Sequence, residues 1–184
     1  SVNDYMQINN INMIRLVPNG SINHRLLISA GNKFYYSDNE GFTLNQSSGL
    51  EGVESWGEIY RSTVSYFDAQ VEPVVFVLTK EWGNGSVIKI FRSDDIGENF
   101  YEIYSTQLAS ERAYDIWTDR YSPSDLYFLN NGELYSLSIL HNNLSFIASA
   151  GPLNQGENIL SAGKDNDNNG LFHFHAKIGD RLYF

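Results

Sequence analysis

Short apolar runs separated by polar turns follow one another along the whole chain. Alternation with a period of two is typical of strands with one buried face, whereas a continuous apolar run such as residues 74–78 indicates a strand buried on both faces. No long segment keeps the 3.6-residue period of an amphipathic helix, and only residues 108–112 favour a short helical turn. The pattern therefore predicts an all-β protein.

The predicted strands fall into four groups. In chain order they are residues 13–17, 26–29, 33–36 and 42–46; then 58–62, 74–78, 87–91 and 100–104; then 114–117, 126–129 and 133–138; and finally 159–161, 171–176 and 181–184. The pair Asn131-Gly132 between two alternating runs predicts a tight hairpin. The Gly- and Ser-rich residues 47–57 are expected to form a loop.

One turn, between the predicted strands 87–91 and 100–104, carries a specific pattern of small polar residues. Gly97 can adopt the positive φ angle that a tight turn requires. Ser93 and Asp95 have short side chains that can accept hydrogen bonds from the amides of the same turn. Phe100 then returns an aromatic ring to the core. We expect a closed hairpin tip here.

A second copy of this pattern lies upstream. It keeps Ser37 and Gly41, has Asn39 in place of the aspartate, and has Leu44 in place of the aromatic residue. A degenerate third copy is predicted in residues 134–140. The spacing of the copies fits one four-stranded antiparallel unit per repeat.

The repeated motif resembles the Asp-box of sialidase-like β-propellers. We name residues 37–44 the first box and residues 93–100 the second box. The resemblance implies an all-β Asp-box β-propeller of about four four-stranded blades. The blades are expected over residues 9–48, 56–106, 112–151 and 157–184, with residues 1–8 completing the last one.

Two arrangements of these blades are open. The N-terminal strand can close a four-bladed ring, or the chain can be a slice of a larger propeller. We favour the slice, because Asp-box proteins usually have more than four blades, and so expect the chain to be part of a larger polypeptide. Residues 55–61 and 79–82 also resemble secreted Asp-box proteins of Bacteroidetes-type bacteria, which implies a secreted or cell-surface location.

Charge and composition narrow the classes of partner. The formal net charge of −10 disfavours nucleic acid and anionic membrane surfaces, because the 12 Lys and Arg residues are scattered. No apolar run is long enough to cross a bilayer, so membrane insertion is not expected. The chain has no cysteine, which excludes disulfides and thiolate chemistry.

One polar segment matches the start of a calcium-binding loop. Asp165, Asp167 and Asn169 alternate before a glycine, and the carbonyl of Leu171 can add a further oxygen ligand. The closing glutamate of such loops is missing, since Ala176 stands in its place. The alternative is a solvated hairpin loop that binds no metal, and calcium is the cofactor that this segment suggests.

The resemblance to sialidases also suggests catalytic candidates near the ends of the inner strands. These enzymes use an arginine cluster, a tyrosine paired with a glutamate, and an aspartate. The matching candidates are Arg15, Arg61, Tyr60, Asp115 and Glu157. An inverting glycosidase with two carboxylates is a further possibility. The simpler interpretation is that these residues are solvated strand ends and ion pairs between blades.

Aromatic residues provide the remaining functional indication. Trp56, Trp82 and Tyr60 can present ring faces that stack on sugars or peptides. We therefore favour a non-catalytic binding or scaffold propeller that engages a glycan or protein ligand. The alternatives are a glycoside hydrolase with its site at the propeller axis, and a luminal sorting-receptor propeller, which the lack of cysteine disfavours.

Overall fold

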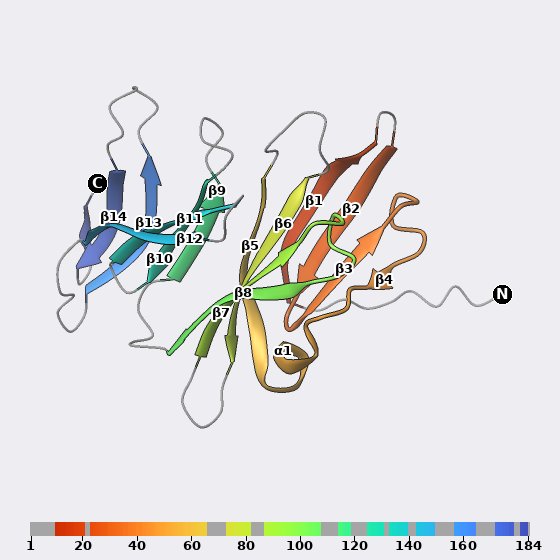
Figure 1. Cartoon of the computed structure of the whole chain (residues 1–184), viewed down its shortest axis with the longest axis horizontal. Coiled ribbons are helices and arrows are strands. Elements are labelled where there is room, and N and C mark those ends of the chain that lie inside the picture. The colour runs from red at the N-terminus through yellow and green to blue at the C-terminus, as the bar shows by residue number, and fades with distance from the viewer. Residues whose placement is uncertain are drawn as a thin grey trace.

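The computed structural model describes residues 10–20, 23–65, 73–81, 87–107, 114–118, 125–130, 133–139, 143–149, 157–164, 172–178 and 181–183. These residues form four antiparallel sheets, one after another along the chain, and one short helix (Figure 1). Within these ranges no helix is both long and apolar enough to cross a membrane.

Each sheet is a meander in which consecutive strands are hydrogen-bonded neighbours. Sheet 1 contains β1 (Ile11–Asn19), β2 (Asn23–Ala30), β3 (Lys33–Ser37) and β4 (Asn45–Gln46); sheet 2 contains β5 (Gly57–Ser65), β6 (Val74–Glu81), β7 (Val87–Ser93) and β8 (Tyr101–Gln107); sheet 3 contains β9 (Tyr114–Thr118), β10 (Asp125–Asn130), β11 (Glu133–Ser138) and β12 (Asn143–Ser149); sheet 4 contains β13 (Glu157–Lys164), β14 (Phe172–Ile178) and β15 (Arg181–Tyr183). Successive four-stranded meanders are the blade topology of a β-propeller. The predicted all-β, propeller-type fold class is confirmed.

The first strands of successive sheets lie next to one another, as the inner strands of a propeller do. β1 contacts β5, and β5 contacts β9. The side-chain amide of Asn12 donates to the carbonyl of Ile59 at 2.8 Å, and the hydroxyl of Thr118 donates to the carbonyl of Val64 at 3.0 Å. Polar side chains thus tie β1 to β5 and β5 to β9.

The first strands of sheets 1, 2 and 4 share an irregularity. The register shifts by one residue between Ile11 and Met13 in β1, between Ile59 and Arg61 in β5, and between Ile159 and Ser161 in β13. Each shift leaves one extra residue outside the ladder, which is a β-bulge. The extra residues are Asn12, Tyr60 and Leu160.

Sheet 2 is buried on both faces by its neighbours. All residues from Val74 to Thr79 in β6 are buried, as the continuous apolar run predicts. Alternate side chains enter two separate cores, one shared with sheet 1 and one with sheet 3. The first core includes Val17, Leu27, Phe34, Val64, Val75, Val77 and Phe91, and the second includes Phe76, Leu78, Ile88, Ile90, Ile116, Leu126, Phe128 and Leu137.

Three local expectations are wrong. Residues 47–57 contain the helix α1 (Glu51–Trp56), because Leu50 and Val53, three positions apart, are buried together in the first core. The third motif copy is not a turn, since Ser136 lies inside β11 opposite Tyr127.

The outer strand expected at residues 42–46 is only Asn45–Gln46, because the first box occupies the preceding positions. The helical turn expected at residues 108–112 lies outside the described residues.

Substitution of two glycines with positive φ can distinguish two causes of lost stability. One is backbone strain, and the other is crowding of the added Cβ by neighbouring side chains. An added Cβ at Gly97 (φ +88°) would lie 3.1 Å from Phe34 and 3.2 Å from Leu27, whereas one at Gly31 (φ +60°) would meet nothing within 4 Å. We expect Gly31→Ala to lower the free energy of unfolding by about 1 kcal/mol through strain alone. Gly97→Ala should cost about 1–3 kcal/mol more, because core side chains must move. Urea denaturation measures both, and equal losses would contradict the crowding argument.

Candidate functional site

The second box is closed by its own side chains. The hydroxyl of Ser93 accepts a hydrogen bond from the amide of Gly97 at 2.8 Å and donates to the carboxylate of Asp95 at 2.7 Å. The same carboxylate accepts from the amides of Glu98 at 3.1 Å and Asn99 at 2.9 Å. Its second oxygen accepts from the side-chain amide of Asn99 at 2.7 Å. These polar contacts hold a turn in which Ile96 and Gly97 both have positive φ.

The first box repeats this geometry with an amide in place of the carboxylate. Ser37 accepts from the amide of Gly41 at 2.9 Å and donates to the carbonyl oxygen of the Asn39 side chain at 2.9 Å. That oxygen also accepts from the amide of Thr43 at 2.8 Å, and the Asn39 NH₂ group donates to the Thr43 hydroxyl at 2.7 Å. Asn39 thus supplies the acceptor that Asp95 supplies in the second box. Gly41 and Gly97 have φ angles of +89° and +88°, so the two tips are equivalent.

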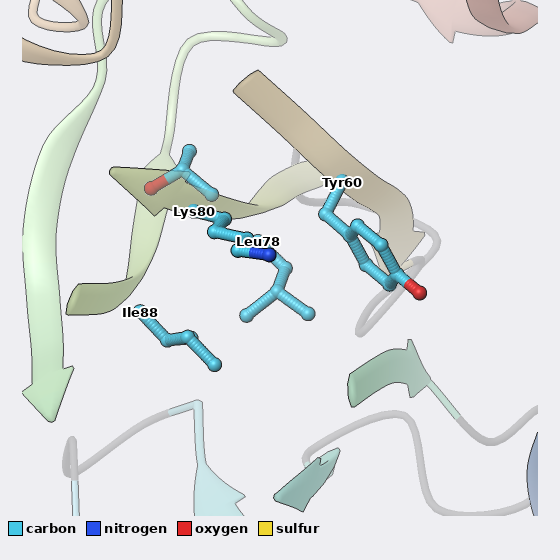
Figure 2. Close-up of a pocket in the computed structure, with 5 residues that line it drawn as sticks. Tyr60, Leu78, Lys80 and Ile88 are labelled. Carbon is cyan, nitrogen blue, oxygen red and sulfur yellow. The ribbon is translucent and has the colours of Figure 1, made fainter. Parts of the chain in front are cut away.

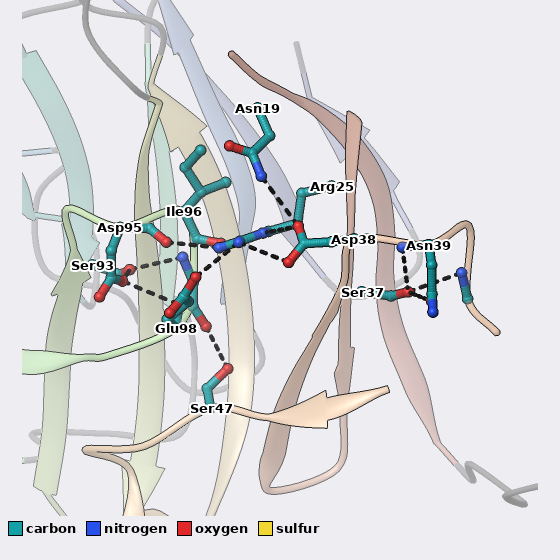
Figure 3. Close-up of polar contacts among 12 residues, drawn as sticks. Asn19, Arg25, Ser37, Asp38, Asn39, Ser47, Ser93, Asp95, Ile96 and Glu98 are labelled. Atoms are coloured by element: carbon teal, nitrogen blue, oxygen red, sulfur yellow. Dashed lines mark hydrogen bonds and ion pairs between the residues drawn. The ribbon is translucent and has the colours of Figure 1, made fainter. Parts of the chain in front are cut away.

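A buried arginine joins the second box to sheet 1 (Figure 3). Arg25 forms ion pairs with Asp38 at 2.7 Å and with Glu98 at 2.8 Å. It also donates to the backbone carbonyl of Asp95 at 2.9 Å, and its guanidinium lies 4.7 Å from the centre of the Tyr36 ring. Nothing in the sequence around residue 25 indicates this role.

The charges at this junction reinforce one another. Burial lowers the pKa of Arg25, but hydrogen bonds to Asp38 and Glu98 outweigh that effect and leave the pKa raised. The hydrogen bond from Arg25 is the main cause of a lowered pKa at Asp38. Burial alone would raise the pKa of Asp95, yet the hydrogen bonds from Asn99, Ser93 and Glu98 lower it. The charged forms of Arg25, Asp38 and Asp95 are therefore favoured in the folded state.

A second polar group lies on β5 and β9, and we call Tyr60, Arg61 and Asp115 the β5 cluster. The guanidinium of Arg61 lies over the Tyr60 ring, 4.7 Å from its centre, and donates to the Tyr60 carbonyl at 3.0 Å. Its Nε is 3.7 Å from the carboxylate of Asp115. That carboxylate accepts the backbone amide of Ile116 at 2.9 Å, and burial raises its pKa despite this bond and the nearby arginine.

The structure brings together three of the five catalytic candidates. Arg15 lies exposed in β1, and no hydrogen bond or ion pair joins it to the β5 cluster in the described part of the chain. Glu157 begins β13 in sheet 4, but its side chain is outside what is described. A sialidase-like arginine cluster is therefore not assembled among the described residues.

A small cavity lies beside Tyr60 of the β5 cluster, and Figure 2 shows the residues that line it. It is lined by Tyr60, Leu78, Thr79, Lys80 and Ile88 and has a volume of about 10 Å³. This is room for about one water molecule, whereas pockets for small ligands measure about 300–1,000 Å³. A ligand at the β5 cluster would therefore contact a surface and would not enter this cavity.

The other predicted ligand positions are not tested. Trp82 and the calcium-loop residues Asp165, Asp167, Asn169 and Leu171 lie outside the described residues. Trp56 ends α1, and its ring is not described either. Within the described ranges no three or more His, Asp or Glu side chains gather in a way that could hold a metal ion.

Comparison with known proteins finds similarity at the level of the fold. No protein-family model and no curated protein matches the chain. The crystal structure of the Nup133 β-propeller domain of Vanderwaltozyma polyspora is similar at 12% identity with a TM-score of 0.44. The match covers 97% of this chain and 57% of that chain, so the chain spans little more than half of that domain. No family assignment follows.

Acid titration tests the box electrostatics. Because the pKa values of Asp38 and Asp95 are lowered in the folded state, their contribution to stability is present above about pH 4, the unfolded value, and is lost as pH falls through the folded values. We expect Asp95→Asn to retain stability at pH 7 within about 1 kcal/mol, since Asn39 fills this position in the first box.

The same variant should lose stability less steeply between about pH 4 and pH 2 than the wild type, because one titrating carboxylate has been removed. Urea denaturation at each pH measures the slope. An unchanged slope would show that Asp95 does not contribute to acid unfolding.

Proposed function

We propose that this chain is a non-catalytic binding or scaffold module of the Asp-box propeller type, from a secreted or cell-surface protein, and that it engages a glycan or protein ligand at the β5 cluster. The observation that carries the proposal is the position of Arg61. Its side chain is 52% exposed, yet it is held between the Tyr60 ring and the Asp115 carboxylate. A guanidinium that is fixed and accessible loses little entropy when it binds a ligand.

The chemistry of this surface suits polar ligands. The cluster combines an aromatic ring, a cation and a carboxylate on adjacent inner strands. Aromatic faces stack on sugar rings or side chains, while the two charged groups can hydrogen-bond hydroxyl, amide or carboxylate groups. The small adjoining cavity favours surface contact over enclosure of a substrate.

One observation favours the hydrolase alternative. Burial raises the pKa of Asp115, and a raised carboxyl pKa is a property of a general acid in glycoside hydrolysis. The ion pair with Arg61 opposes this shift, and a second carboxylate facing Asp115 is not found within the described ranges. The binding role is therefore our preferred conclusion.

Ligand binding is tested with a matched pair of arginine variants. Arg61→Ala should weaken glycan-array or pull-down binding at least tenfold, about 1.4 kcal/mol, because it removes the fixed cation. Arg15→Ala, at an exposed arginine of β1, should leave the affinity unchanged. Both variants should melt within a few degrees of the wild type, since exposed ion pairs contribute little. Equal losses in both variants would show non-specific attraction and contradict a specific site.

Catalysis is tested separately on a panel of fluorogenic glycosides. We expect no turnover by the wild-type chain. Turnover that disappears in Asp115→Ala or Glu157→Ala would replace the binding proposal with the hydrolase alternative.

A further inference from the structure

One face of sheet 1 is apolar, and its β1 side chains are open to solvent, whereas Ile28 beside them on β2 is only 7% exposed. Ile14 and Leu16, which alternate on β1, are each 62% exposed. Their cross-strand partners on β2 are Ile28 and Leu26, and Ile28 is paired in turn with Tyr35 on β3. Exposed apolar patches of this kind mark interaction surfaces.

The strand pairing that starts from each box serine shows which residues of sheet 2 are equivalent to this face of sheet 1. Ser37 on β3 is opposite Leu26, which is opposite Leu16. In sheet 2, Ser93 on β7 is opposite Val75, which is opposite Val64. Leu16 and Val64 are therefore equivalent positions in successive blades, and so are Leu26 and Val75.

The equivalent face of sheet 2 is fully covered. Val64 is only 3% exposed, and Val75, Val77 and Phe91 are buried in the same cluster. The opposite face of sheet 1 covers them with Val17, Leu27 and Phe34. The equivalent face of sheet 2 is thus packed against sheet 1, and we call this contact between two sheets a seam. The exposed face of sheet 1 occupies the corresponding position in the preceding sheet.

The first box extends the same surface. Glu98 in the second box reaches across the seam to Arg25 of sheet 1. Counting from the box serines, Phe42 is the residue of the first box that corresponds to Glu98, and it is 89% exposed. Among the described residues, therefore, no sheet covers the strand face and the box tip of sheet 1 in the way that sheet 1 covers their counterparts in sheet 2.

Sheet 4 does not supply this neighbour. It lies at the opposite end of the molecule from sheet 1 (Figure 1). We propose that the open face of sheet 1 seats a further four-stranded antiparallel sheet of the same blade type, supplied by the same polypeptide outside these 184 residues. Its contacting face is apolar and carries counterparts of Leu27 and Phe34. This proposal is independent of the ligand proposed for the β5 cluster.

The absence of cysteine makes the proposal directly testable by thiol labelling. In the full encoded polypeptide, Leu16→Cys should react with an aqueous maleimide at least tenfold more slowly than Ser105→Cys, an exposed position on the outer strand β8. Both thiols should react at the same rate in denaturant. Ile14→Cys on the same face serves as a second probe if the first variant does not fold.

Two outcomes would overturn the proposal. Labelling of Leu16→Cys and Ile14→Cys as fast as Ser105→Cys in the folded full polypeptide would show that the face is open. Protection that disappears on dilution together with a dimer seen by size-exclusion chromatography would show that a second copy covers it. Protection that persists in a monomeric full polypeptide supports a further blade.

Discussion

The structure depends on sheets that are apolar on both faces. In β6 every residue from Val74 to Thr79 is buried, so sheet 2 cannot satisfy its hydrophobic surface by packing against one neighbour. Burial of apolar area is the main favourable term in folding, and two-faced sheets gain it only when they are stacked in series. The two cores on either side of sheet 2 are the direct result.

Polar groups determine how the sheets are aligned, because apolar packing alone has little directional preference. Arg25 of sheet 1 pairs with Glu98, which follows sheet 2's strand β7. Arg92 of sheet 2 donates to the carbonyl of Ile139, which follows strand β11 of sheet 3, and pairs with Asp94 at 2.7 Å. A buried guanidinium is costly unless its donors are satisfied, so each arginine favours a narrow range of sheet positions. The box turns contribute by presenting rigid carbonyl and carboxylate acceptors to Arg25.

The sequence predicts most of the strands and the two turns at residues 37–44 and 93–100, because period-two alternation and the Ser/Gly turn chemistry are local signals. It misses β12 (Asn143–Ser149), for which no strand is expected. Helix α1 is missed, since Gly52 and its polar neighbours disfavour a helix, whereas the burial of Leu50 and Val53, which stabilises it, depends on the tertiary fold. Arg25 is missed because its partners lie 13 and 70 positions away in the chain. Among the site candidates, Arg61 and Asp115 do meet, yet their adjacency is a property of neighbouring sheets that no local pattern encodes.

The bulges on β1, β5 and β13 affect which residues of a blade can change in sequence. A residue that takes no part in the ladder can change its chemistry without shifting the register of the strand that carries it. Asn12, Tyr60 and Leu160, which hold this position in three blades, already differ in size and polarity. Substitutions at these three positions would change the side chains on the first strands while the backbone ladder within each sheet stays constant, although at Asn12 they would also remove its bond to Ile59.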